Sequence, residues 1–135
     1  MGVNVDISLR PEIWDAHPNS DIRSVIWNIG VLDELADEEG MTSLSELGLA
    51  EEDDDEEEDS NPHYFKAAEG VATIECLINR LRSTPKEAKE RARHKKRLAS
   101  LQDGPEALIE ELEELLRSLK VAEKRKAKFR LFIAQ

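Results

Sequence analysis

The chain has 135 residues, of which 39% are apolar, with 30 acidic against 19 basic residues and a net charge of −11. A chain of this length buries roughly two-thirds of its unfolded surface, so we expect a single domain over residues 1–135. Its one cysteine, Cys76, excludes an intramolecular disulfide. The first ten residues lack the features of a secretory signal, and no apolar run reaches the about 20 residues of a membrane span, so we expect a cytoplasmic protein without membrane contact.

The charge is distributed very unevenly along the chain. Residues 1–60 hold 19 acids and 2 bases, whereas residues 61–135 hold 11 acids and 17 bases. The first part therefore has a net charge of −17 and the second a net charge of +6. Such a protein resists nonspecific contact with anionic membranes and nucleic acid, although its basic part can still make local contacts.

The N-terminal residues predict a strand followed by a short helical turn. Apolar side chains alternate with polar ones, which is the period of a strand with one buried face, at Val3, Val5, Ile7 and Leu9. Pro11 then favours a helical turn that carries Ile13 and Trp14. Both tryptophans, Trp14 and Trp27, are interpreted as residues of the core or its rim.

A helix is predicted next, because apolar residues over positions 22–36 share one helical face. We expect Ser20 or Asp21 to cap this helix and Gly40 to end it. The Ser43 and Glu46 pair has the spacing of a capping box and predicts a further short helical turn.

Residues 51–59 read EEDDDEEED. Nine adjacent carboxylates repel one another in a compact element, so we expect a solvated loop over about residues 50–62. A loop is favoured over a mimic of a phosphate backbone, because mimicry needs charges spread over a rigid surface. The tract also lacks the turn glycine of an EF-hand calcium loop. As a binding site for a basic partner it offers Glu51, Glu52, Asp53, Asp54, Asp55, Glu56, Glu57, Glu58 and Asp59.

A second helix is predicted over residues 65–82, with its apolar face on Val71, Ile74, Ile78 and Leu81. On nearly the opposite face, Ala68, Ala72 and Cys76 are small enough to let another element approach closely. Pro85 ends this helix, because the residue before a proline is pushed out of helical geometry.

Residues 86–97 carry seven bases against two acids and predict a helix that is weakly anchored over about residues 86–100. The segment has no aromatic side chain for base stacking, so any binding of nucleic acid would be electrostatic. Pairing of this basic segment with the acidic tract is an equally simple role and is slightly preferred.

The C-terminal residues predict the most regular helix and a last strand. Leucines spaced by four and three residues follow a break at residues 103–105, and they are Leu108, Leu112, Leu115 and Leu119. Packing within the chain is favoured over a dimer contact, because the pattern spans little more than two heptads; we expect a monomer or a weak homodimer. Phe129, Leu131 and Ile133 then alternate with Arg130 as in a strand, although Phe132 interrupts the pattern on the other face. The fold class is therefore α+β, with a small sheet that pairs the N- and C-terminal strands and is covered by three to five helices.

No catalytic constellation is present. His17, His63 and His94 lie in separate segments without the spacing of metal ligands, and Cys76 is best interpreted as a small packing residue. No nucleophile elbow, phosphate-binding loop or dinucleotide-binding glycine pattern occurs. We accordingly assign no catalytic residue, no metal site and no cofactor.

Four fragments together resemble a group of small, uncharacterised bacterial proteins. They are LDELADEEGMTSLSEL (residues 32–47), YFKAAEGVATIECLINRLR (64–82), LEELLRSLKVAEK (112–124) and FRLFI (129–133). The resemblance implies an acidic loop after the first helix, a leucine-rich helix before a final strand, and a bacterial origin. It implies no activity. The tract at 51–59 and the basic insert at 86–97 depart from the pattern as local elaborations.

The leading hypothesis is a non-enzymatic, immunity-like inhibitor or other interaction protein that presents an acidic surface to a basic protein partner. The alternative is a nucleic-acid-associated protein that uses residues 86–97, together with the basic run at 120–130. The third hypothesis is a small enzyme or ligand carrier, for which Glu69, Thr73 and His63 are the first polar residues to inspect.

Overall fold

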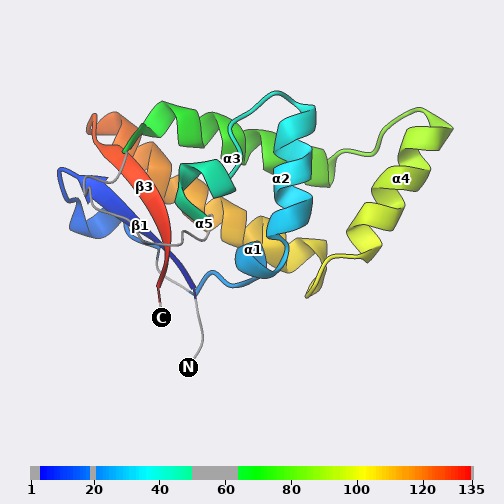
Figure 1. Ribbon diagram of the computed structural model, residues 1–135, viewed down its shortest axis with the longest axis horizontal. Coiled ribbons are helices and arrows are strands. Elements are labelled where there is room, and N and C mark those ends of the chain that lie inside the picture. Colours follow the sequence, from blue (N-terminus) through cyan, green and yellow to red (C-terminus); the bar gives the residue numbers. More distant parts are fainter. Residues whose placement is uncertain (1–3, 19–20, 50–63, 135) are drawn as a thin grey trace, which may run out of the picture.

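The computed structural model describes residues 4–18, 21–49 and 64–134, which form an α+β fold (Figure 1). Three antiparallel strands lie in the order β1-β3-β2, with bounds Asn4–Arg10 for β1, Phe65–Lys66 for β2 and Lys128–Ala134 for β3. β1 pairs with β3 along its whole length, from Asn4 opposite Ala134 to Arg10 opposite Lys128. The predicted pairing of the two terminal strands is confirmed.

The described residues form seven helical elements. They are the 3₁₀ turn η1 (Trp14–Ala16), α1 (Ser24–Trp27), α2 (Ile29–Glu38), the turn η2 (Ser45–Leu49), α3 (Ala67–Arg82), α4 (Ala88–Ala99) and α5 (Gly104–Lys124). α4 lies at one end of the molecule and the sheet at the other (Figure 1). None of the described helices is long and apolar enough to cross a membrane.

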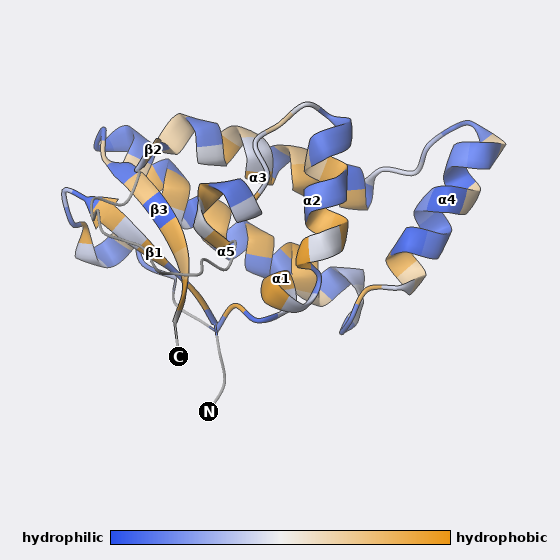
Figure 2. Ribbon diagram, viewed as in Figure 1, coloured by the Kyte–Doolittle hydropathy of each residue, from blue (hydrophilic) through white to orange (hydrophobic). Residues whose placement is uncertain are grey.

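The core lies between the inner face of the sheet and helices α3 and α5. The α5 leucines that the spacing singles out are completely buried within the chain, namely Leu108, Leu112, Leu115 and Leu119. Packing within the chain is thus confirmed, and these leucines are not available for a dimer contact. Hydrophobic colour lines the facing sides of α3 and α5, whereas α4 is mostly hydrophilic (Figure 2).

The helix predicted over residues 22–40 is divided in two at Asn28, so the prediction of one helix is wrong. The buried Asn28 side chain donates to Ser24 O (2.9 Å) and Gln102 O (3.2 Å) and accepts from Gln102 N (2.9 Å). These bonds fix the loop before α5 against the junction of α1 and α2. The predicted capping by Asp21 is also wrong, since α1 begins after Arg23 without a side-chain cap. Gly40, with φ of 69°, ends α2 as predicted.

The capping box is confirmed: Glu46 N donates to Ser43 Oγ (3.2 Å) and Ser43 N donates to Glu46 Oε1 (3.3 Å). The turn that it starts continues to Leu49. Gly48, with φ of 132°, lies directly on β3, where a Cβ atom would stand 2.0 Å from Leu131 O. Only glycine lets η2 approach the β3 backbone this closely.

The second predicted helix begins two residues later than expected, because Phe65 and Lys66 form β2 and pair with Phe129 and Lys128 of β3. The face with small side chains does not receive another element either, since Ala68 and Ala72 are exposed. The close approach occurs instead at Gly70, whose hydrogen faces the Phe129 ring and Leu119.

The two tryptophans do not lie in the core. Trp14 is 82% exposed and Trp27 is 47% exposed, so the prediction of core or rim is wrong for Trp14. Tyr64 and Phe65 are half-buried, and the Phe65 ring packs beside that of Phe129 at a centroid distance of 6.0 Å.

Candidate functional site

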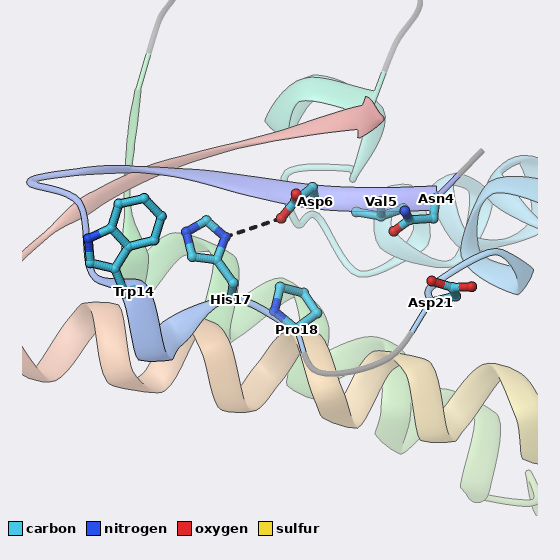
Figure 3. Close-up of a pocket in the computed structure, with 7 residues that line it drawn as sticks. All are labelled: Asn4, Val5, Asp6, Trp14, His17, Pro18 and Asp21. Atoms are coloured by element: carbon cyan, nitrogen blue, oxygen red, sulfur yellow. Dashed lines mark hydrogen bonds and ion pairs between the residues drawn. The ribbon is translucent and has the colours of Figure 1, made fainter. Parts of the chain in front are cut away.

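An open cleft of about 420 Å³ lies between the first half of β1 and the segment around η1 (Figure 3). It is lined by Asn4, Val5, Asp6, Trp14, His17, Pro18 and Asp21. The alternation of β1 turns Val5 into the core and Asp6 away from it, so the strand supplies a carboxylate to the cleft. A large exposed aromatic side chain beside carboxylates is the feature that distinguishes this cleft.

His17 is held between two carboxylates. Its Nδ1 lies 3.2 Å from Asp6 Oδ1, and its Nε2 is hydrogen-bonded to Glu12 Oε2. Partial burial disfavours the charged imidazolium, but the hydrogen bonds to Glu12 and Asp6 outweigh it, and the pKa of His17 is raised above its usual value. Because both ring nitrogens are engaged, His17 has no free nitrogen with which to act as a general base.

The segment that carries Trp14 and His17 is anchored to α5. Arg117 donates to His17 O (2.8 Å) and Asp15 O (3.4 Å) and pairs with Glu114 (2.9 Å) one turn earlier on α5. A guanidinium that bonds two backbone carbonyls fixes the path of the chain. Trp14 is thus exposed on a fixed turn, and its ring lies 6.2 Å from that of His17.

A second groove, of about 630 Å³, runs along α2 and carries only acidic charge. Its lining residues are Gly30, Val31, Asp33, Glu34, Asp37, Met41, Ser43 and Glu46. Asp33 is fixed there by hydrogen bonds from the backbone N–H and the hydroxyl of Ser45. The two grooves together place carboxylates from the N-terminal part of the chain on the surface of the fold.

The acidic tract itself, residues 51–59, lies outside the described residues. The predicted partner-binding residues Glu51 to Asp59 are therefore placed in neither groove.

The basic segment forms α4, and some of its charge is paired with α2. Arg97, whose side chain is only 10% exposed, lies 2.9 Å from Glu38 and 3.3 Å from Glu34, and Arg93 lies 3.8 Å from Glu38. Arg80 of α3 also bonds to Glu38 (2.9 Å). The Arg80 and Arg97 guanidinium groups hold the pKa of Glu38 below its usual value. The carboxylates that pair with part of the basic segment thus lie on α2. Pairing of the basic segment with the acidic tract at residues 51–59 stays a prediction.

The residues of the third hypothesis do not converge on a site. Thr73 is buried and donates to Thr42 O (2.8 Å), while Glu69 accepts from the Thr42 hydroxyl (3.1 Å), so both fix the loop after α2. His63 lies outside the described residues. Burial and the charge of Glu39 raise the pKa of the Cys76 thiol, which disfavours the reactive thiolate.

Within the described residues, no group of three or more histidine, cysteine, aspartate or glutamate side chains is placed so that it could hold a metal ion.

Sequence reasoning missed the cleft at Trp14. The segment WDAHP placed an aromatic residue and a histidine close together, but the pattern was interpreted as a buried turn. Asp6 was assigned only to a strand. What brings Asp6 to His17 is the position of η1 beside the free edge of β1, which no local pattern reveals.

No protein-family model matches the chain, and neither a curated protein nor a solved structure does. The resemblance to the group of bacterial proteins stays a prediction and transfers no activity. A fold class alone does not determine a function. The features of this fold that bear on function are the cleft beside β1 and the groove along α2.

Proposed function

We propose that the protein is a non-enzymatic, immunity-like inhibitor or interaction protein of the cytoplasm that presents an acidic surface to a basic protein partner. The observation that carries this proposal is the cleft beside β1, where Trp14 is 82% exposed at one end and Asp21 lies at the other, with Asp6 and His17 between them (Figure 3). Tryptophan is among the residues that contribute most to protein interfaces. An exposed tryptophan on a fixed turn, beside carboxylates, is suited to receive an arginine or lysine side chain.

One cation of the partner would stack on the Trp14 ring, and a second cation would pair with Asp21 at the other end of the cleft (Figure 3). A cation over an aromatic ring contributes about 0.5–2 kcal/mol, more when water is excluded. Asp21 is the more accessible acid, because its side chain is 66% exposed and, within the described part of the chain, pairs with the exposed Arg23 at 3.1 Å. Asp6 is already engaged by His17, so we assign it the role of shaping the cleft.

The groove along α2 and the acidic tract would extend the negative surface beyond the cleft. Asp33, Glu34, Asp37 and Glu46 line the groove without a basic residue among its lining residues. Glu51 to Asp59 add nine further carboxylates to the same N-terminal part of the chain. Such a field steers a basic partner during approach, while the cleft provides the specific contact.

The proposal is tested with Trp14 as its own reporter. In a Trp27→Phe background, titration with a short peptide containing a central Arg-Arg pair should change Trp14 fluorescence, and a Gln-Gln peptide should not. Asp21→Asn should weaken binding about three- to ten-fold. Trp14→Ala should weaken it by at least as much; because this variant lacks the reporter, its binding is measured by the anisotropy of a labelled peptide. Glu123→Gln removes the same charge from an exposed position on α5, outside both grooves, and is the matched control. If Asp21→Asn and Glu123→Gln weakened binding equally, the interaction would be nonspecific electrostatic attraction.

The alternative, nucleic-acid association through residues 86–97, has less support because Arg93 and Arg97 face acids of α2. Lys95 and Lys96 remain exposed. If this helix binds RNA or DNA, replacing Lys95, Lys96 and Arg97 by Gln should abolish binding.

A further inference from the structure

The outer face of the sheet carries a row of three cations at one end. Lys128 of β3 lies directly opposite Arg10 of β1 and, on its other side, directly opposite Lys66 of β2. Residues that are directly opposite in an antiparallel pair point to the same face of the sheet. All three side chains are exposed, so the fold places them side by side in solvent across the three strands.

Such an arrangement is unfavourable in the protein alone. Like charges directly opposite on neighbouring strands destabilise a sheet. Several other described cations of this acidic protein are paired with carboxylates, namely Arg80, Arg82, Arg97, Arg117, Lys120 and Arg125. Within the described residues, no carboxylate forms an ion pair with any member of the row.

The fold also fixes one end of the row. The Arg10 guanidinium stacks on the Tyr64 ring, 4.5 Å from its centroid. The Tyr64 hydroxyl is in turn hydrogen-bonded to the Ser8 side chain at 2.6 Å. Arg10 is therefore held over the outer face of the sheet and not free to swing away from Lys128.

We propose that this row, here called the cation row (Arg10, Lys66 and Lys128), binds the phosphates of a single-stranded nucleic acid. Neighbouring strands lie about 4.8 Å apart, so the row presents three positive charges across about 10 Å. Phosphates along a single strand would neutralise the repulsion among these three cations, which form no ion pair with a carboxylate of the described residues.

An exposed aromatic side chain favours a nucleic acid over an acidic peptide. Phe132 is 38% exposed and lies four residues along β3 from Lys128, on the same face and about 13 Å away. Proteins that bind single strands combine a cationic track with aromatic rings on which bases stack. An acidic peptide would use the cation row but has no planar bases to stack on Phe132.

The cation row is separate from the cleft of the proposed function. The cleft uses the first three residues of β1 and the row uses its last residue, Arg10. Four residues separate Asp6, the cleft residue of β1 nearest to the row, from Arg10, a distance of about 13 Å. Phe132 lies directly opposite Asp6, so a single strand that reaches Phe132 ends beside the cleft.

The test is binding of a labelled 12-nucleotide single strand of RNA, and separately of DNA, by anisotropy at two salt concentrations. The full chain is compared with Lys66→Gln/Lys128→Gln, with Phe132→Leu and with Lys95→Gln/Lys96→Gln, which removes the same charge from α4. We expect ten-fold or greater weakening by the first variant, three- to ten-fold by the second and less than two-fold by the third. The slope of log affinity against log salt should fall in magnitude by about 1.4 when two phosphate contacts are lost.

Since the substituted side chains are exposed, the variants should fold, and their circular dichroism spectra and melting temperatures verify this. Arg10→Gln provides a second variant of the row should the double variant fail to fold. Absence of binding by the full chain at low salt would overturn the proposal, as would equal weakening by the two double lysine variants. Competition by polyglutamate as effective as by the single strand, with no effect of Phe132→Leu, would assign the cation row to an acidic peptide instead.

Discussion

At the scale of single residues, Gly70 shows how closely α3 lies on the sheet. A Cβ atom there would stand 2.6 Å from Cζ of Phe129 and 2.9 Å from Cδ1 of Leu119, and both side chains are completely buried. Neither can move without disturbing its neighbours. Gly30 of α2, by contrast, has no atom within 4 Å of the corresponding position.

Substitution by alanine should therefore change the free energy of unfolding in opposite directions at the two glycines. Gly70→Ala should lower the free energy of unfolding by about 1–3 kcal/mol through overpacking. Gly30→Ala should raise it by about 0.5–1 kcal/mol, because alanine is the better helix former at an exposed position. Urea denaturation measures both changes. A neutral or stabilising Gly70→Ala would show that α3 does not lie on Phe129 as described.

His17 should make the cleft sensitive to pH. Its pKa is raised in the folded protein, so its contribution to stability is fully present below the unfolded pKa and is lost as pH rises through the folded pKa. The same loss of a positive charge makes the cleft more negative. Affinity for the Arg-Arg peptide should thus increase as pH rises through that range, and His17→Gln should abolish the increase. Fluorescence titrations from pH 6 to pH 8.5 measure this change in affinity. A wild-type affinity that falls as pH rises would contradict the proposed binding of a cationic side chain beside His17.

At the scale of elements, α4 is held to the body by ion pairs with α2 and by the partly buried Leu98. No residue of α4 is buried, and Arg97 pairs with two acids of α2. Exposed ion pairs are individually worth only about 0–1 kcal/mol and are weakened by salt. α4 is therefore the described helix most dependent on ionic conditions for its position.

Removing the central carboxylate should loosen this helix. Glu38→Gln should speed backbone amide hydrogen exchange in α4 while leaving α5 unchanged, and high salt should do the same in the wild type. Because the folded pKa of Glu38 is lowered, its contribution is present above the unfolded pKa and is lost as pH falls through the folded one. Glu113→Gln, which breaks the exposed pair with Arg82, is the control. Exchange in α4 that is the same at low and high salt would count against charge as its anchor.

At the scale of the whole molecule, groups of acidic and of basic side chains lie on different surfaces, although acids of α2 also pair with Arg80, Arg93 and Arg97. Asp33, Glu34 and Asp37 lie on the α2 surface, and Asp6 and Asp21 line the cleft. The cation row lies at the far end of β1 from that cleft. One small fold therefore presents surfaces of opposite sign that can select different partners.

Association with a basic partner should depend steeply on ionic strength. In stopped-flow measurements with the Arg-Arg peptide, the association rate constant should fall several-fold between 50 and 500 mM salt, because salt screens long-range steering. The dissociation rate constant should change less. A variant in which amides replace the nine carboxylates of residues 51–59 should show a weaker dependence of the association rate constant on salt. An association rate that is flat in ionic strength would contradict electrostatic steering.

The sequence by itself determined the elements whose signal is local. The alternation at Val5, Ile7 and Leu9 and that at Phe129 and Leu131 predicted the paired strands, and the leucine spacing predicted α5. The capping box of Ser43 and Glu46 was predicted as well, because its two residues are three positions apart. Burial of one face leaves a periodic trace in the sequence, so these features can be predicted without the fold.

Only the tertiary structure decided the features that depend on distant partners. The break at Asn28 arises from bonds to Gln102, which is 74 residues away. The cleft requires the η1 turn to lie beside β1, and the cation row requires residues 10, 66 and 128 to meet across three strands. Polar contacts between segments leave no period in the sequence, because each is made once and its partners are set by packing. For this reason the core could be predicted from the chain, whereas the candidate sites had to be found in the fold.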